Sequence, residues 1–268
     1  MMNIDKSFDK SLFSIRFIGD DFEERGVSIY DLSSTFISFQ RIIHKAHLSL
    51  EGRLNIGAFP KIEERQMLAL QIGERKRKSD AFSLLPILSD PTTHEYMLNL
   101  ADHVLAGMIG YYTGKVLNTL ETEKNPIKKL FISSIYPEIS DIVNRIEAAG
   151  GVEGISIGSP IKNKETIVSF TSETKDYLQT IKDQYYLGDY MEIEGSPYKL
   201  YPNSRIVSIK NGRKSIDIHL NQEDFDHIRF TQVSKADFLF KGRPRYHLGV
   251  KTPTIRNFEA ISITYLPK

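Results

Sequence analysis

The sequence predicts an α+β protein in which an N-terminal mixed helix and sheet domain precedes a small antiparallel β-barrel. Two observations indicate this class. Helical and strand-like apolar patterns alternate through the first part of the chain, and helical periodicity then stops near residue 190, where short strand-like runs take over. We place the domains at residues 1–188 and 189–268, because Gly188, Gly195 and Pro197 interrupt the pattern there.

Composition is that of a folded chain. Of the 268 residues, 40% are apolar and 26% charged, and the net charge is +1. Disorder requires low hydrophobicity and high net charge, so we exclude it. The length fits one large domain or two small ones.

The first strand is expected within Ser11–Gly19, and the clearest helix follows over Ser28–Leu50. Ser28 or Asp31 can cap the start of that helix. Apolar residues recur every three or four positions and predict one buried side, with Lys45 and Ser49 on the solvent side. The apolar residues are Leu32, Phe36, Phe39, Ile43, Ala46 and Leu50.

A hairpin is expected from two apolar runs at residues 67–73 and 81–88, and a long helix from Asp90 to about Leu120. Three glycines inside that helix share one side. Either another element of the chain approaches the helix closely there, or the glycines form a groove for a partner helix, in a homo-oligomer or with another protein. These glycines are Gly107, Gly110 and Gly114.

The remaining body is expected to contain a helix over Pro137–Ala149, two strands around residue 160 and a helix starting at Thr171 or Ser172 and running to about Gly188. Five short strands then follow at the spacing typical of an SH3-like or OB-like barrel, and Asn211-Gly212 is a strong hairpin signal. The five are Arg205–Ile209, Ser215–Leu220, His227–Val233, Phe238–Leu248 and Phe258–Tyr265.

Charge is unevenly divided between the two predicted domains. Residues 189–268 hold 13 Lys and Arg against 9 Asp and Glu, a net charge of +4, which leaves −3 on the rest. Cationic groups contact phosphates and aromatic faces stack on bases, so a basic barrel suggests binding to DNA or RNA; a solvated basic loop is the alternative. The candidate residues are Lys241, Arg243, Arg245, Tyr246, Arg213 and Lys214.

Several chemistries are excluded. The absence of cysteine removes disulfides, thiolate zinc sites and iron–sulfur clusters, and no nucleotide-binding loop, HExxH or GxSxG motif is present. We therefore expect no cofactor and no metal. His44 and His47 could form one edge of a metal site, but core-edge or surface positions explain them better.

One titratable cluster leaves an enzymatic alternative open. Asp217 and His219 share a strand face and precede Glu223, Asp224, Asp226 and His227. A carboxylate beside a histidine can support a metal-dependent hydrolase or nuclease. The alternative explanation is an exposed acidic turn between strands.

Neither a membrane span nor a secretory signal is expected. The longest run without Asp, Glu, Lys, Arg or His in the central helix covers only residues 104–114, and the first ten residues alternate acidic and basic groups. We therefore expect a cytoplasmic protein without a membrane partner.

One pattern resembles a known group. An N-terminal strand, the helix start Val27–Leu32 and a second hairpin strand near Ser79–Ser83 precede a long helix and a final small β-domain. This layout resembles a group of uncharacterised bacterial proteins, a domain of unknown function. The resemblance implies a bacterial cytoplasmic protein from a mobile-element or phage-defence context, with no catalytic residues to transfer.

Together these observations predict a non-enzymatic binding protein whose C-terminal barrel contacts nucleic acid. The alternatives are a protein-interaction or oligomeric scaffold built on the glycine-containing helix, and a metal-dependent hydrolase or nuclease.

Overall fold

The computed structural model describes residues 11–20, 22, 26–54, 59–76, 80–86, 91–162, 164–212, 214–231, 237–249 and 255–266. The chain forms two compact units. Unit 1 comprises Met1–Gln184 with Leu248–Thr252, and unit 2 comprises Tyr185–His247 with Pro253–Lys268. The boundary predicted between residues 188 and 189 therefore lies inside unit 2, just after its first strand.

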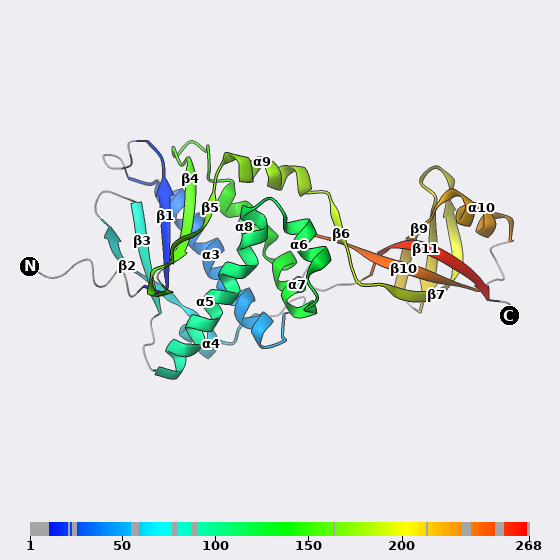
Figure 1. Cartoon of the computed structure of the whole chain (residues 1–268), viewed down its shortest axis with the longest axis horizontal. Coiled ribbons are helices and arrows are strands. Elements are labelled where there is room, and N and C mark those ends of the chain that lie inside the picture. Colours follow the sequence, from blue (N-terminus) through cyan, green and yellow to red (C-terminus); the bar gives the residue numbers. More distant parts are fainter. Residues whose placement is uncertain are drawn as a thin grey trace, which may run out of the picture. The chain divides into compact units, whose positions relative to one another are not determined.

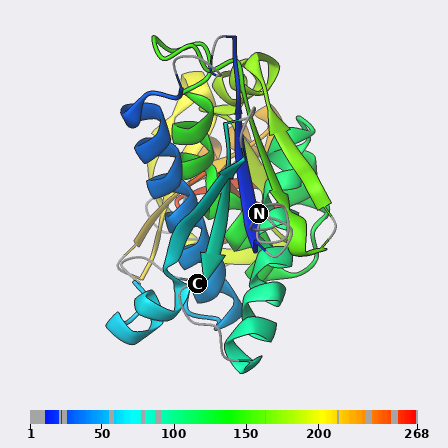
Figure 2. The same ribbon diagram turned by 90° about the vertical axis from the view of Figure 1, so that its left-hand side faces the viewer.

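Unit 1 is an α+β domain built on a five-stranded antiparallel sheet with the order β2-β3-β1-β4-β5. Figure 2 shows the sheet in front of the helices, which gather behind one of its faces. The elements are β1 (Phe13–Ile18), α3 (Ile29–Leu50), α4 (Ile62–Leu68), β2 (Leu70–Lys76), β3 (Asp80–Pro86), α5 (Pro91–Tyr112), α6 (Val116–Thr122), α7 (Pro126–Ser134), α8 (Tyr136–Val143), β4 (Gly154–Ser159), β5 (Lys164–Phe170) and α9 (Ser172–Ile181).

Helix α3 confirms the predicted helix, and the Ser28 side chain caps it by accepting from the Asp31 backbone N–H at 3.1 Å. The predicted solvent side is wrong at Lys45 and Ser49, which are both buried. Helices α7 and α8 pack on that side of α3. The Lys45 ammonium donates to the Ser134 carbonyl at 2.6 Å and pairs with Glu138 of α8.

The predicted long helix from residue 90 to 120 is two helices, α5 and α6, because Gly114 adopts a left-handed φ of +67° between them. A Cβ on Gly107 would overlap the Phe131 ring of α7, and one on Gly110 would lie 3.1 Å from Thr119 Oγ1 of α6. The chain's own helices therefore fill the space beside Gly107 and Gly110, as the close-approach interpretation expects.

Unit 2 contains a closed five-stranded barrel with the strand order β7-β8-β9-β11-β10, and β10 pairs back to β7 (Figure 1). The barrel is mixed, which corrects the antiparallel prediction, because β9 and β11 run parallel. The elements are β6 (Tyr185–Leu187), β7 (Met191–Tyr201), β8 (Ile206–Asn211), β9 (Lys214–His219), α10 (Gln222–Phe230), β10 (Asp237–His247) and β11 (Asn257–Leu266).

Two predictions within the barrel are wrong. The predicted strand His227–Val233 belongs largely to α10. Phe225 and Ile228 lie three positions apart in this helix, on one face, and both are buried. The expected acidic turn forms the start of the same helix, capped by Asn221. Strand β7 was missed altogether because Gly195 and Pro197 resemble a linker.

The hairpin predicted at Asn211-Gly212 is confirmed. Asn211 pairs with Lys214 across the turn, and Gly212 has a φ of +61°.

The barrel core follows the two-residue period of its strands. The buried cluster comprises Ile193, Val207, Ile209, Ile216, Ile218, Leu220, Phe225, Ile228, Phe238, Phe240, Phe258 and Ala260.

Among the helices that the structure describes, none combines the length and the apolar character needed to cross a bilayer.

Candidate nucleic-acid interface

Three of the predicted cations lie together on the outward face of β10 rather than in a loop, and each is engaged within unit 2. Lys241 pairs with Glu192 at 2.8 Å. The Arg243 Nε donates to the Gly188 carbonyl at 2.7 Å, and Arg245 pairs with a carboxylate of β11 at 3.1 Å. Lys241 and Arg245 are therefore compensated by carboxylates of neighbouring strands, whereas Arg243 is bound to backbone carbonyls.

The other three candidates are placed differently. Tyr246 packs over Gly188, where an added Cβ would lie 2.6 Å from its ring, and burial raises its pKa to about 12. Lys214 is exposed at the start of β9, which β11 separates from β10. Arg213 lies outside the described residues. Of the described candidates, Lys241, Arg243, Arg245 and Tyr246 therefore lie on β10 and Lys214 lies on β9.

A β-bulge in β7 creates a different aromatic surface. The register with β8 shifts between Pro197 and Lys199. Pro197 faces the core before the shift and Leu200 packs against the core after it. Because a bulge inserts one extra residue, Tyr198, Lys199 and Tyr201 all become exposed on the outside of the barrel.

Tyr198 lies across the sheet. Its hydroxyl is 2.7 Å from Ser215 Oγ on β9, although its own backbone belongs to β7, so the side chain spans β8. The Lys210 ammonium lies 5.4 Å from the ring centroid, within cation–π range. The residue stays 49% exposed, which leaves ring surface open to solvent.

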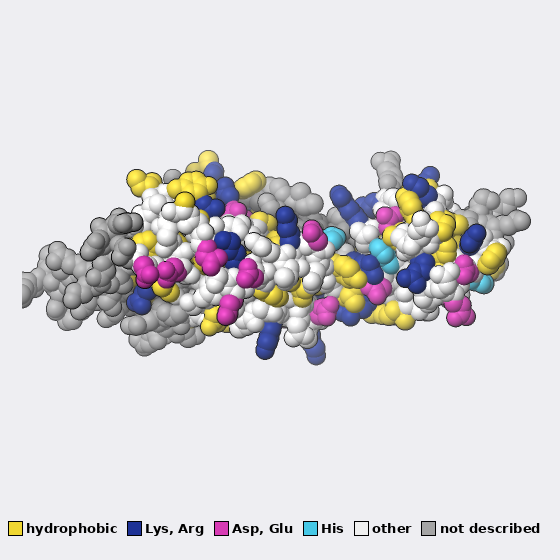
Figure 3. All heavy atoms as spheres, turned by 90° about the horizontal axis from the view of Figure 1, so that it is seen from above, with side chains coloured by type: hydrophobic (Ala, Val, Ile, Leu, Met, Phe, Trp, Pro, Cys, Tyr) yellow, Lys and Arg dark blue, Asp and Glu magenta, His cyan; other side chains and the backbone are white. Residues whose placement is uncertain are grey.

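Tyr201 repeats this combination at the end of β7. The Lys199 ammonium lies 4.5 Å from its ring centroid, and the hydrogen bond between the two side chains raises the pKa of Lys199. Figure 3 shows dark blue Lys and Arg side chains among hydrophobic, His and magenta Asp and Glu side chains over the barrel at the right. We call the outward set on β7, β8, β9 and the β7–β8 loop the tyrosine–lysine face: Tyr198, Lys199, Tyr201, Arg205, Lys210 and Lys214.

The titratable pair on β9 is held by hydrogen bonds. Asp217 accepts from Ser208 Oγ at 2.5 Å. His219 Nδ1 lies 3.1 Å from an Arg245 amine, which can only donate, so the ring proton is on Nε2 and faces Asn257 Oδ1 at 3.3 Å. Burial, together with the charge of Arg245, lowers the pKa of His219 and favours the neutral ring.

No three His, Asp or Glu side chains gather to hold a metal ion in the described parts of the chain. Glu223, Asp224 and Asp226 lie on α10, and His44 Nε2 lies 3.2 Å from the Gln40 amide. His47, the other histidine considered for a metal edge, takes part in a separate polar cluster.

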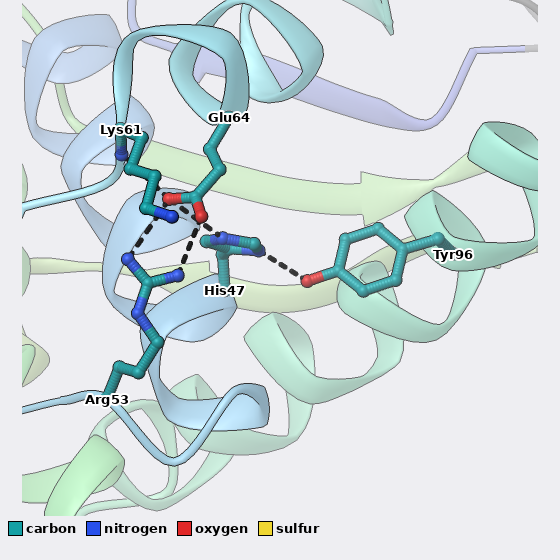
Figure 4. Close-up of polar contacts among 5 residues, drawn as sticks. All are labelled: His47, Arg53, Lys61, Glu64 and Tyr96. Atoms are coloured by element: carbon teal, nitrogen blue, oxygen red, sulfur yellow. Dashed lines mark hydrogen bonds and ion pairs between the residues drawn. The ribbon is translucent and has the colours of Figure 1, made fainter.

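This second cluster joins α3, α4 and α5 in unit 1 (Figure 4). His47 Nδ1 lies 2.5 Å from the Tyr96 hydroxyl. Glu64 receives two hydrogen bonds from Arg53, at 2.7 and 3.3 Å, and one from the Lys61 backbone N–H at 2.7 Å. These donors lower the pKa of Glu64 to about 2. Sequence reasoning missed the cluster because separate segments supply its members.

Comparison of the chain with protein-family models, curated proteins and solved structures found no match.

Proposed function

We propose that the barrel of unit 2 is an OB-like module that binds single-stranded nucleic acid on the tyrosine–lysine face. Its strand order, with a helix between the third and fourth barrel strands, supports this assignment. OB-folds are five-stranded Greek-key barrels that bind oligonucleotides on their second and third strands and adjoining loops. Here these are β8, β9 and the loop at Pro202–Ser204.

The observation that carries the proposal is the bulge that turns Tyr198 and Tyr201 outward, each with a lysine over its ring. Aromatic side chains stack on bases, and each stacked base contributes about 1–3 kcal/mol. Lysines contact the phosphates and make the affinity dependent on salt. Both groups are present on one exposed face, and the partners of its lysines are tyrosines, whereas Lys241 and Arg245 of β10 are paired with carboxylates.

A single strand suits this surface better than a duplex. The Tyr198 ring lies across β8. A base can stack on this ring only if no neighbouring base already covers the face that the base would present. In a duplex the bases stack on each other, and sequence reading occurs at groove edges. The proposal therefore expects a preference for unpaired DNA or RNA.

The first test measures binding of the full chain to fluorescent oligonucleotides of about 20 nucleotides, which exceeds the site size of one OB barrel. We expect micromolar or tighter binding to single strands, weaker binding to the matched duplex, and affinity that falls as salt rises from roughly 50 to 200 mM. Fluorescence anisotropy provides the measurement. Absence of salt-dependent binding in the micromolar range would overturn the proposal.

A second test replaces the aromatic groups. Y198A/Y201A should weaken single-strand binding at least roughly tenfold, because stacking on two bases is lost. The control is Y190A, which removes a 58% exposed tyrosine that precedes β7, at the far end of that strand from Tyr201. Equal losses in the two variants, with both folded by circular dichroism, would contradict a role for this face.

The bacterial, cytoplasmic and defence-related setting expected from the sequence stays a prediction. The contacts of the tyrosine–lysine face support a binding role.

A further inference from the structure

We propose that Arg53, the Lys61 backbone N–H and His47 form a binding site for a terminal phosphate group, and that the Glu64 carboxylate fills this site as an internal ligand. The inference concerns unit 1 and does not depend on the function of the barrel. Its basis is that donors from α3, from the segment after it and from the start of α4 converge on one carboxylate (Figure 4).

His47 shows that the carboxylate fills the site incompletely. Its side chain is only 5% exposed, and its buried Nε2 has no hydrogen-bond partner in the described chain. Glu64 Oε2 is the facing group, at 3.5 Å, too far for a good hydrogen bond. Both oxygens of Glu64 are already engaged by Arg53 and Lys61. A phosphate monoester has three strong acceptor oxygens and can serve all the donors.

Glu64 and Tyr96 together suit His47 as a donor toward the site. The atom that faces the Glu64 carboxylate is Nε2, and a carboxylate can only accept, so a proton on Nε2 suits this contact. With the proton there, Nδ1 accepts from the Tyr96 hydroxyl, 2.5 Å away, and burial raises the pKa of that phenol to about 12, which keeps its proton in place. An N–H group aimed at an anionic oxygen, next to a two-point guanidinium, is the usual arrangement for holding phosphate.

Helix α4 is attached in a way that allows Glu64 to leave. Of its seven residues only Leu68 is buried, and the Leu68 carbonyl accepts a bond from Gln40 of α3 at 3.0 Å. That anchor does not involve Glu64. Glu64 is also the N3 residue of the capping box of α4, so rotation of its side chain gives up the bond from the Lys61 N–H while the anchor at Leu68 remains.

The burial of His47 also selects the ligand. Only the end of a ligand can reach an Nε2 that lies this deep, so we expect a terminal phosphate and not an internal phosphodiester. This separates the site from the barrel surface, which would contact the sugar–phosphate backbone.

The test compares E64A with the wild-type chain, using inorganic phosphate as the probe in calorimetry and thermal shift. We expect E64A to bind phosphate at least roughly tenfold more tightly, because a tethered competitor has been removed. The matched control is E63A, which removes an exposed carboxylate from the same helical turn. A 5′-nucleoside monophosphate, tested in parallel, distinguishes an ester ligand from free phosphate.

The double variants E64A/R53A and E64A/H47F should lose the gained affinity while remaining folded by circular dichroism. Three outcomes would overturn the proposal: no gain in E64A, an equal gain in E63A, or retention of the gain in both double variants. The second outcome would reveal a general charge effect in place of a site.

Discussion

At the residue scale, the ion pair of Lys45 and Glu138 is the least expected feature of unit 1. Each side chain is 10% exposed, and the pair joins α3 to α8 inside the helical layer. Desolvation opposes the burial of two charges, so a pair of this kind contributes little net stability as a whole. Loss of one partner, however, leaves the other charged and buried.

This imbalance gives a prediction for mutants. K45A and E138A should each lower the free energy of unfolding by about 3–5 kcal/mol, whereas K45M/E138L should lower it by much less than their sum. Urea denaturation of the three variants measures the difference. K128A, which breaks the more exposed pair with Glu123, is the control and should cost about 0–1 kcal/mol. Additive losses in the double variant would contradict the expectation.

At the element scale, a single glycine sets the approach of α5 to α7. Gly107 has no side chain where the Phe131 ring lies, and its burial reflects packing within the chain. The helix pair therefore depends on a small residue at that one position. A partner helix could not use the same position without displacing α7.

We expect G107A to destabilise unit 1 by about 1–3 kcal/mol, the usual range for overpacking, even though alanine is the better helix former by about 1 kcal/mol. Thermal or urea unfolding measures the loss. Ala106 is the exposed neighbour of Gly107, so A106G measures the effect of helix propensity without a change in packing. F131L should reduce the loss of stability caused by G107A, because the smaller side chain leaves space for the added methyl group. A stabilised G107A would show that the ring moves freely out of the way.

At the scale of the whole molecule, local signals predict some features well. The capped helix α3 and the Asn211-Gly212 hairpin follow from neighbouring residues alone. Strand β7 could not be predicted, because Gly195 and Pro197 act as strand residues only through pairing with β8 and β10. The tyrosine–lysine face and the cluster around Glu64 depend on such distant pairings, so neither has a signature in the sequence.

The parallel pairing of β9 with β11 has a consequence for synthesis. The barrel closes only when β11 pairs with both β9 and β10. The pairing with β9 brings Asn257 beside Asp217, which lies far from it in the sequence. While a ribosome is still making β11, the earlier strands form an open sheet with two unpaired edges and an uncovered aromatic core, including Phe238 and Phe240. The nascent barrel is therefore most vulnerable to aggregation in the interval before β11 emerges.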